Sequence, residues 1–127
     1  MIKSLFTTDL YIKVKNNQFE AKCLSSSSRW ESARPAKPFS TERLLVGTFS
    51  AAEPALKSLV KKVTPRGIIK KSPRVIIQPL EYLEGGLSEV EERVLKELAL
   101  SAGAFKVVLH TGEELTDADA STLLDRK

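Results

Sequence analysis

The stretch "PRVIIQPLEYLEGGLSEVEERVLKELALSAGAFKVVLH", Pro73–His110, decides the fold class. Its apolar run Val75–Ile77 is typical of a strand covered on both faces, and Pro79 should end that strand because proline has no N–H to donate. A helix follows, and the apolar segment from Ala104 predicts a second strand. Two strands joined through a helix favour parallel pairing with a right-handed crossover.

The helix between these strands has signals at both ends. Ser88 and Glu91 have the spacing of a capping box, in which each side chain accepts a hydrogen bond from the other residue's backbone N–H. Gly103 suits the C′ position, where the backbone is left-handed. The apolar stripe of this helix consists of Val90, Val94, Leu95 and Leu98.

The N-terminal part of the chain predicts a β-hairpin. Apolar and polar residues alternate within Asp9–Val14, which is the period of a half-buried strand, and the alternation resumes at Phe19–Cys23. Asn16 and Asn17 lie between the two runs and suit a tight turn, because asparagine tolerates positive φ. The serine- and proline-rich segment 25–41 predicts a mobile loop, which can include a short strand near Trp30.

A strand at Leu44–Thr48 and a helix after it are predicted next. Ser50 and Glu53 have capping-box spacing, and Pro54 should fall in the first turn, where its missing N–H costs little. The helix should stop near Thr64–Gly67. Its predicted apolar face consists of Leu56, Leu59, Val60 and Val63.

The complete order of elements predicts an α/β fold. After the hairpin and an uncertain third strand, the chain alternates α-β-α-β-α, and Thr116 with Asp119 marks the start of the last, short helix. We therefore expect a mixed sheet with a leading antiparallel hairpin, formed by residues 1–127 as a single domain.

Composition excludes several classes of protein. The chain has 127 residues, of which 42% are hydrophobic and 28% charged, and no apolar run approaches the roughly 20 residues that span a bilayer. The alternating N-terminal sequence lacks the apolar core of a secretion signal, so we expect a cytoplasmic protein. Because Cys23 is the only cysteine and His110 the only histidine, we expect no metal site, and we expect no cofactor.

The pair Gly85–Gly86 precedes a helix start, where backbone N–H groups and the helix dipole suit an anion. The surrounding sequence matches neither nucleotide-binding glycine motif, and its glutamates would repel phosphate. We interpret the pair as a turn.

The stretch Pro54–Leu80 contains basic residues and no acidic residue. Two interpretations fit this run: a patch that binds a polyanion, or a solvated helix face followed by a polar connector. The candidate patch residues are Lys57, Lys61, Lys62, Arg66, Lys70, Lys71 and Arg74. His110 has no evident catalytic partner and Cys23 lies in a predicted strand, so we expect no enzyme.

Pro73–His110 resembles a segment of the bacterial actin MreB, in which a buried strand precedes a helix and another strand. "MIKSLFTTDLYIKV" looks like the start of that family, and "VGTFSAAEPALKSLVKKV" looks like its first long helix. The resemblance implies a truncated actin-like, ribonuclease-H-like half-domain. Where actin-like ATPases have the phosphate-binding turn D-L-G-T, this chain has "KVKNN", Lys13–Asn17, so no active-site residue carries over.

Four other pieces resemble the small YjaA-like proteins of enteric bacteria. The pieces are "LYIKVKNNQ" (10–18), "ERLLVGTFSAAEPALKSLV" (42–60), "PRG" (65–67) and "LEYLEGGLSEVEERVLKE" (80–97). Members of that family are described as stress-response proteins, linked to acid or oxidative stress and to biofilm growth. The resemblance implies a process and no chemical activity.

We therefore expect a non-catalytic, cytoplasmic interaction protein on a degenerate actin-like scaffold, involved in the bacterial stress response and biofilm formation. Its partner would be an unidentified protein, and a homo-oligomer is open because an unpaired sheet edge favours self-association. The alternative is a regulator that binds a polyanion or nucleic acid through the basic segment 57–74.

Overall fold

The computed structural model describes residues 8–25, 29–65 and 73–126. These residues form a mixed α/β arrangement of five strands and three helices. In chain order the elements are β1 (Asp9–Lys15), β2 (Gln18–Cys23), β3 (Glu31–Ala33), α2 (Phe49–Val63), β4 (Arg74–Pro79), α3 (Glu89–Ser101), β5 (Lys106–Leu109) and α4 (Asp117–Arg126).

The sheet has the strand order β3-β2-β1-β4-β5. The hairpin β1–β2 and the pair β2–β3 are antiparallel, whereas β1–β4 and β4–β5 are parallel. The hairpin turns at Asn17, whose φ is 53°, as the asparagine pair predicts. The predicted mixed sheet with a leading antiparallel hairpin is confirmed.

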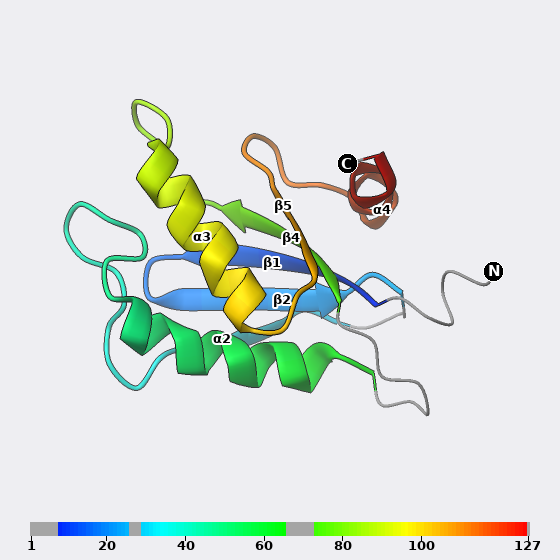
Figure 1. Ribbon diagram of the computed structural model, residues 1–127, viewed down its shortest axis with the longest axis horizontal. Helices are drawn as coiled ribbons and strands as arrows, with labels where there is room; N and C mark the ends of the chain where they lie inside the picture. The colour runs from blue at the N-terminus through cyan, green and yellow to red at the C-terminus, as the bar shows by residue number, and fades with distance from the viewer. Residues whose placement is uncertain (1–7, 26–28, 66–72, 127) are drawn as a thin grey trace.

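The two faces of the sheet have different covers (Figure 1). Helices α2 and α3 lie next to each other on one face, over the alternating residues Leu10, Ile12 and Val14 of β1. The opposite face carries Tyr11, Ile76 and Val108, and α4 packs there through Ala120 and Leu124. Because successive side chains of a strand point to opposite faces, Tyr11 lies beneath α4 while its neighbours lie in the main core.

The central strand β4 and both predicted ends of α3 are confirmed. Every residue of β4 is buried, and the strand ends at Pro79. Ser88 and Glu91 form the capping box, and Gly103 follows the helix with φ of 116°. The Gly85–Gly86 turn is also present, because both glycines have positive φ and the Gly86 N–H donates to Leu83 O at 2.9 Å.

The apolar stripe of α3 is predicted only in part. Leu95, Leu98 and Ala99 are buried, but the side chain of Val90 is 71% exposed. Val90 lies five residues before Leu95, which places it about 140° away around a helix of 3.6 residues per turn. Val90 therefore points away from the face that packs on the sheet.

The prediction of a strand at Leu44–Thr48 is wrong. These residues form a turn, in which the N–H groups of Gly47 and Thr48 donate to Phe39 O at 2.8 and 2.9 Å. An apolar run forms a strand only when another strand pairs with it, and here Leu45 alone is buried. Helix α2 begins directly after this turn.

The predicted start of α2 is also wrong. The helix begins at Phe49 with Thr48 as N-cap, and no side chain caps it, so Ser50 and Glu53 form no capping box. Pro54 consequently lies in the second turn, where its missing N–H leaves the Ser50 carbonyl without its helical donor. Ser50 is exposed, so water can satisfy that carbonyl. The predicted buried residues of α2 are confirmed, as is its end at Thr64.

The segment 25–41 contains the short strand β3, as the sequence allows. Its mobility stays a prediction, and residues 26–28 lie outside the described residues. Towards its end Phe39 is fully buried and stacks on Phe19 with ring centroids 4.6 Å apart. The side-chain oxygen of Asn17 accepts 2.8 Å hydrogen bonds from the N–H groups of Phe39 and Ser40. This end of the segment therefore belongs to the core.

Candidate functional site

Four of the seven residues of the predicted basic patch lie within the described residues. Lys57, Lys61 and Lys62 are exposed on α2. Lys57 pairs with Glu53 at 3.8 Å, and Lys62 pairs with Glu31 of β3 at 3.1 Å. Three further candidates lie outside the described residues: Arg66, Lys70 and Lys71.

Arg74 is buried at the start of β4. Its guanidinium donates two 2.8 Å hydrogen bonds to the Asp9 carboxylate and makes a 2.9 Å ion pair with Asp125 of α4. The hydrogen bonds to Asp9 raise the pKa of Arg74 above its usual value, and Asp125 adds to the shift. Arg74 therefore joins β4 to β1 and α4 and does not face an external polyanion.

An apolar groove lies between residues 44–46 and the N-terminal half of α3. A second hollow adjoins this groove, because Val90 and Val94 line both. The other residues that line the second hollow are Phe49, Arg93 and Glu97. Val90 stands between the two hollows and is 71% exposed, and Leu44 is 41% exposed. We name this surface the α3 groove; its first part is lined by Leu44, Leu45, Val46, Leu87, Val90, Glu91, Val94 and Leu95.

Tyr82 joins the segment after β4 to the segment that leads into residues 44–46. Its hydroxyl donates to Thr41 O at 2.8 Å, and it accepts a 2.6 Å hydrogen bond from the Asn16 side-chain amide. Gly47 lies in the same turn, and a side chain does not fit there because a Cβ atom would collide with the Thr41 side chain. The start of the turn that contains residues 44–46 is thus held by a residue that is distant in sequence.

The charge around the α3 groove is acidic. Residues 81–101 contain six glutamates and two basic residues, whereas the whole chain has a net charge of +4. The glutamates are Glu81, Glu84, Glu89, Glu91, Glu92 and Glu97. The groove therefore combines apolar walls with an acidic surrounding.

A second candidate site lies on the sheet face opposite α2 and α3, over β1, β2 and β3. The Lys13 ammonium lies 4.0 Å from the centre of the Trp30 ring, and the Lys22 ammonium lies 5.6 Å from it. The Trp30 ring also meets the Tyr11 ring edge-on, with centroids 5.2 Å apart. We name this surface the open face.

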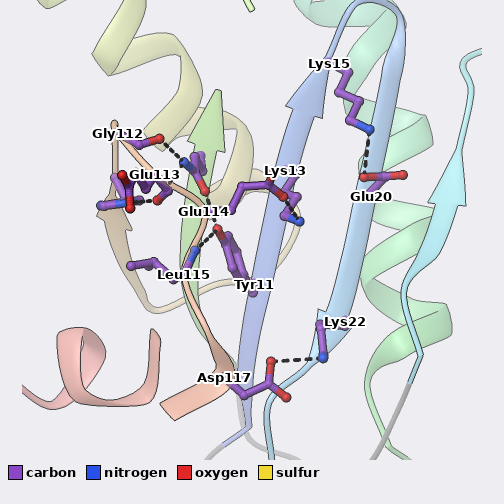
Figure 2. Close-up of polar contacts among 12 residues, drawn as sticks. Tyr11, Lys13, Lys15, Glu20, Lys22, Gly112, Glu113, Glu114, Leu115 and Asp117 are labelled. Atoms are coloured by element: carbon purple, nitrogen blue, oxygen red, sulfur yellow. Dashed lines mark hydrogen bonds and ion pairs between the residues drawn. The ribbon is translucent and has the colours of Figure 1, made fainter. Parts of the chain in front are cut away.

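Residues 110–117 lie beside the open face and neutralise two of its lysines (Figure 2). Glu114 pairs with Lys13, and Asp117 pairs with Lys22 at 2.9 Å. The lysine side chains are 12% and 15% exposed, whereas Glu114 and Asp117 are 58% and 55% exposed. The carboxylates therefore lie on the solvent side of the lysines.

Buried polar groups hold the same 110–117 segment. The Tyr11 hydroxyl donates to the side-chain oxygen of Gln78 and accepts a 3.1 Å hydrogen bond from the Leu115 N–H. The Gln78 amide donates to Gly112 O at 2.9 Å. Burial raises the pKa of Tyr11, and the hydrogen bond and charge of Lys13 lower the pKa of Glu114.

The remaining candidate residues form no further site. The Nε2 atom of His110 lies 2.8 Å from Glu113 O, and Cys23 is buried in β2. Within 8–25, 29–65 and 73–126, no group of three or more His, Cys, Asp or Glu side chains could hold a metal ion. In the same ranges, no helix has the length and apolar character needed to cross a bilayer.

Comparison with known proteins places the chain in a family. No protein-family model matches it. A relative from Escherichia coli (strain K12), described as "Uncharacterized protein YjaA", is 38% identical over 102 residues, which cover 76% of this chain and 78% of the relative. The chain belongs to the YjaA family. The resemblance to YjaA-like proteins is thereby confirmed, and the relative's description assigns no activity.

Proposed function

We propose that this member of the YjaA family is an interaction protein that binds a partner protein through the α3 groove. The observation that carries the proposal is Val90, an aliphatic residue that is 71% exposed between two hollows with apolar walls. Contiguous exposed apolar surface on a folded protein marks interaction sites more often than chance. The hydrogen bond from the Tyr82 hydroxyl to Thr41 O holds the start of the turn that forms one wall.

The chemistry of the α3 groove favours one kind of occupant. Apolar walls suit an amphipathic helix that inserts aliphatic or aromatic anchors at positions i, i+3 and i+4. The six glutamates of residues 81–101 favour a partner with lysine or arginine beside those anchors, since opposite charges orient the encounter. The proposed partner segment is therefore a basic amphipathic helix.

The scaffold that carries the groove is proposed to be a truncated actin-like, ribonuclease-H-like half-domain. Support comes from the antiparallel hairpin followed by parallel strands joined through helices, and from the resemblance of Pro73–His110 to MreB. The segment Lys13–Asn17, at the end of β1 and in the hairpin turn, lacks the phosphate-binding sequence of actin-like ATPases. A non-catalytic, cytoplasmic role in stress adaptation and biofilm growth rests on the resemblance to YjaA-like proteins and is part of the proposal.

Substitutions on α3 test the proposal with a matched control. Val90→Asp places a charge in the groove, whereas Leu100→Asp changes another exposed residue, 43% exposed, at the opposite end of the same helix. The tagged native chain and its Leu100→Asp variant should both capture a partner protein from cell extract. The Val90→Asp variant should not capture it. A synthetic peptide from that protein should bind the purified chain and contain basic residues beside apolar anchors. Equal retention by both variants would overturn the proposal.

A further inference from the structure

The open face brings together an aromatic ring and cations from β1, from β2 and from the residue that follows β3. Tyr11, Lys13 and Lys15 alternate along β1, and their antiparallel partners on β2 are Lys22, Glu20 and Gln18. On β3, Ser32 lies opposite Glu20, and the Arg34 guanidinium reaches Gln18 Oε1 at 3.3 Å. The cations of the open face are Lys13, Lys15, Lys22 and Arg34.

The strands leave this face rich in positive charge. Apart from Asp9, which is paired with Arg74, they contribute one carboxylate to it, Glu20, which binds Lys15 at 3.2 Å. Helix α4 packs on β4 and β1 and reaches β2 through the ion pair of Asp117 with Lys22, and among the described helices none packs on β3 on this side. Trp30, Ser32 and Arg34 are exposed there.

We propose that the open face binds single-stranded nucleic acid, with Trp30 stacking on a base and Lys13 and Lys22 binding the adjacent phosphates. Base stacking on aromatic rings within a positively charged surface is the general means of binding single strands without sequence preference. A sheet face with an exposed aromatic ring is also a known platform for unstacked bases. Duplex is a poor occupant, because its bases are not free to stack on Trp30.

The 110–117 segment acts as an internal competitor for this ligand. Glu114 and Asp117 occupy the positions that phosphates would take at Lys13 and Lys22. Both carboxylates are more than half exposed whereas the lysines are 12% and 15% exposed, so another anion can approach each lysine only from the side that the carboxylate occupies. Binding should therefore be weak in the native chain and should increase when the carboxylates are neutralised.

Intrinsic fluorescence tests this inference, because Trp30 is the only tryptophan in the chain. The purified full chain is titrated at low salt with an oligodeoxythymidine, which should quench Trp30 saturably and less so as salt increases. The double variant Glu114→Gln with Asp117→Asn should bind about fivefold tighter, as expected for removing two exposed ion pairs. Lys13→Gln with Lys22→Gln should lose binding.

Two controls make each outcome decisive. The double variant Lys57→Gln with Lys61→Gln, on α2, should bind like the native chain, and circular dichroism should show that every variant is folded. Unchanged affinity on neutralising Glu114 and Asp117, or binding lost with Lys57 and Lys61 instead, would overturn the inference. Duplex DNA or heparin that binds as tightly as the oligodeoxythymidine, without a change in Trp30 fluorescence, would also overturn the inference. The groove variant Val90→Asp should bind normally, which separates this site from the proposed protein-binding site.

Discussion

The Arg74 guanidinium binds the Asp9 carboxylate through two parallel 2.8 Å hydrogen bonds between adjacent strands. Both side chains are nearly buried, with 9% and 13% of their surface exposed. Because the two residues are 65 positions apart, this ion pair connects the start of β1 to the start of β4. Arg74 is therefore part of the core of the fold rather than of a basic surface.

Removing the Arg74 side chain should destabilise the protein strongly. Arg74→Met leaves Asp9 with a buried, uncompensated charge, which costs about 3 to 5 kcal/mol of unfolding free energy. The matched control Lys61→Met removes an exposed lysine of α2 and should change stability by less than about 0.5 kcal/mol. Urea unfolding measures both, and equal effects of the two substitutions would contradict the placement of Arg74.

The two serine–glutamate pairs of capping-box spacing should respond differently to substitution. Ser88→Ala removes a cap that the Glu91 N–H uses, and should cost about 1 kcal/mol of unfolding free energy. Ser50→Ala changes a residue inside α2 that caps nothing, and should change stability by less than about 0.5 kcal/mol. A larger loss at Ser50 than at Ser88 in chemical denaturation would refute the observed start of α2.

Two substitutions on α3 should change the free energy of unfolding by different amounts, because one side chain is buried and the other is exposed. Leu95→Ala should cost about 2 to 5 kcal/mol because Leu95 is 3% exposed in the core. Val90→Ala should stay within about 0.5 kcal/mol, since its side chain already lies in water. Thermal or urea unfolding decides between them, and a large loss at Val90 would mean that it is packed rather than available to a partner.

The Tyr11 hydroxyl should stabilise the 110–117 segment. Tyr11→Phe leaves the Leu115 N–H and the Gln78 oxygen without this partner, at a cost of about 1 to 3 kcal/mol. Amide hydrogen exchange should become faster at Leu115. In α2, protection against exchange should fall only by the amount that the lower global stability of the variant explains. Unchanged exchange at Leu115 would show that the hydroxyl does not hold the segment.

Alkaline pH should destabilise the protein through the same residue. Burial raises the pKa of Tyr11 above its usual 10.0, so the folded state favours the neutral phenol. The contribution of the neutral Tyr11 phenol to the free energy of unfolding is complete below about pH 10 and is lost as pH rises through the folded-state pKa. The urea midpoint should therefore begin to fall near about pH 10 and fall further above it, and it should fall less in Tyr11→Phe. Identical alkaline profiles of the two proteins would exclude Tyr11 as the cause.

The sequence predicts the elements whose signals are local. The continuous apolar strand before Pro79, the capping box at Ser88 and the glycine at Gly103 all act within a few residues, and all three are confirmed. Thr116 is also confirmed as the start of α4, because its hydroxyl accepts from the Asp119 N–H at 3.1 Å.

The errors come from contacts between distant residues. At Leu44–Thr48 the Phe39 carbonyl accepts two backbone N–H groups, which makes a turn of an apolar run and starts α2 at Phe49. In the basic run, Lys57, Lys61 and Lys62 are exposed, but Arg74 is buried and pairs with Asp9. Neither partner is recognisable from local periodicity.

The two candidate sites were missed for the same reason. The α3 groove forms where residues 44–46 meet a helix that is distant from them in sequence, and the open face needs the pairing of β1, β2 and β3 to bring Trp30 over Lys13 and Lys22. One local signal was available for the groove. Val90 is about 140° from Leu95 around the helix, which already removes it from a single buried stripe.

The most direct test of the proposed function is site-specific photo-crosslinking from position 90 in the native cells, with position 57 on α2 as the control. The proposal predicts a discrete protein adduct from position 90 that position 57 does not give, joined to a partner peptide with basic residues beside apolar anchors. Identical products from both positions, or a partner peptide that is acidic, would contradict it.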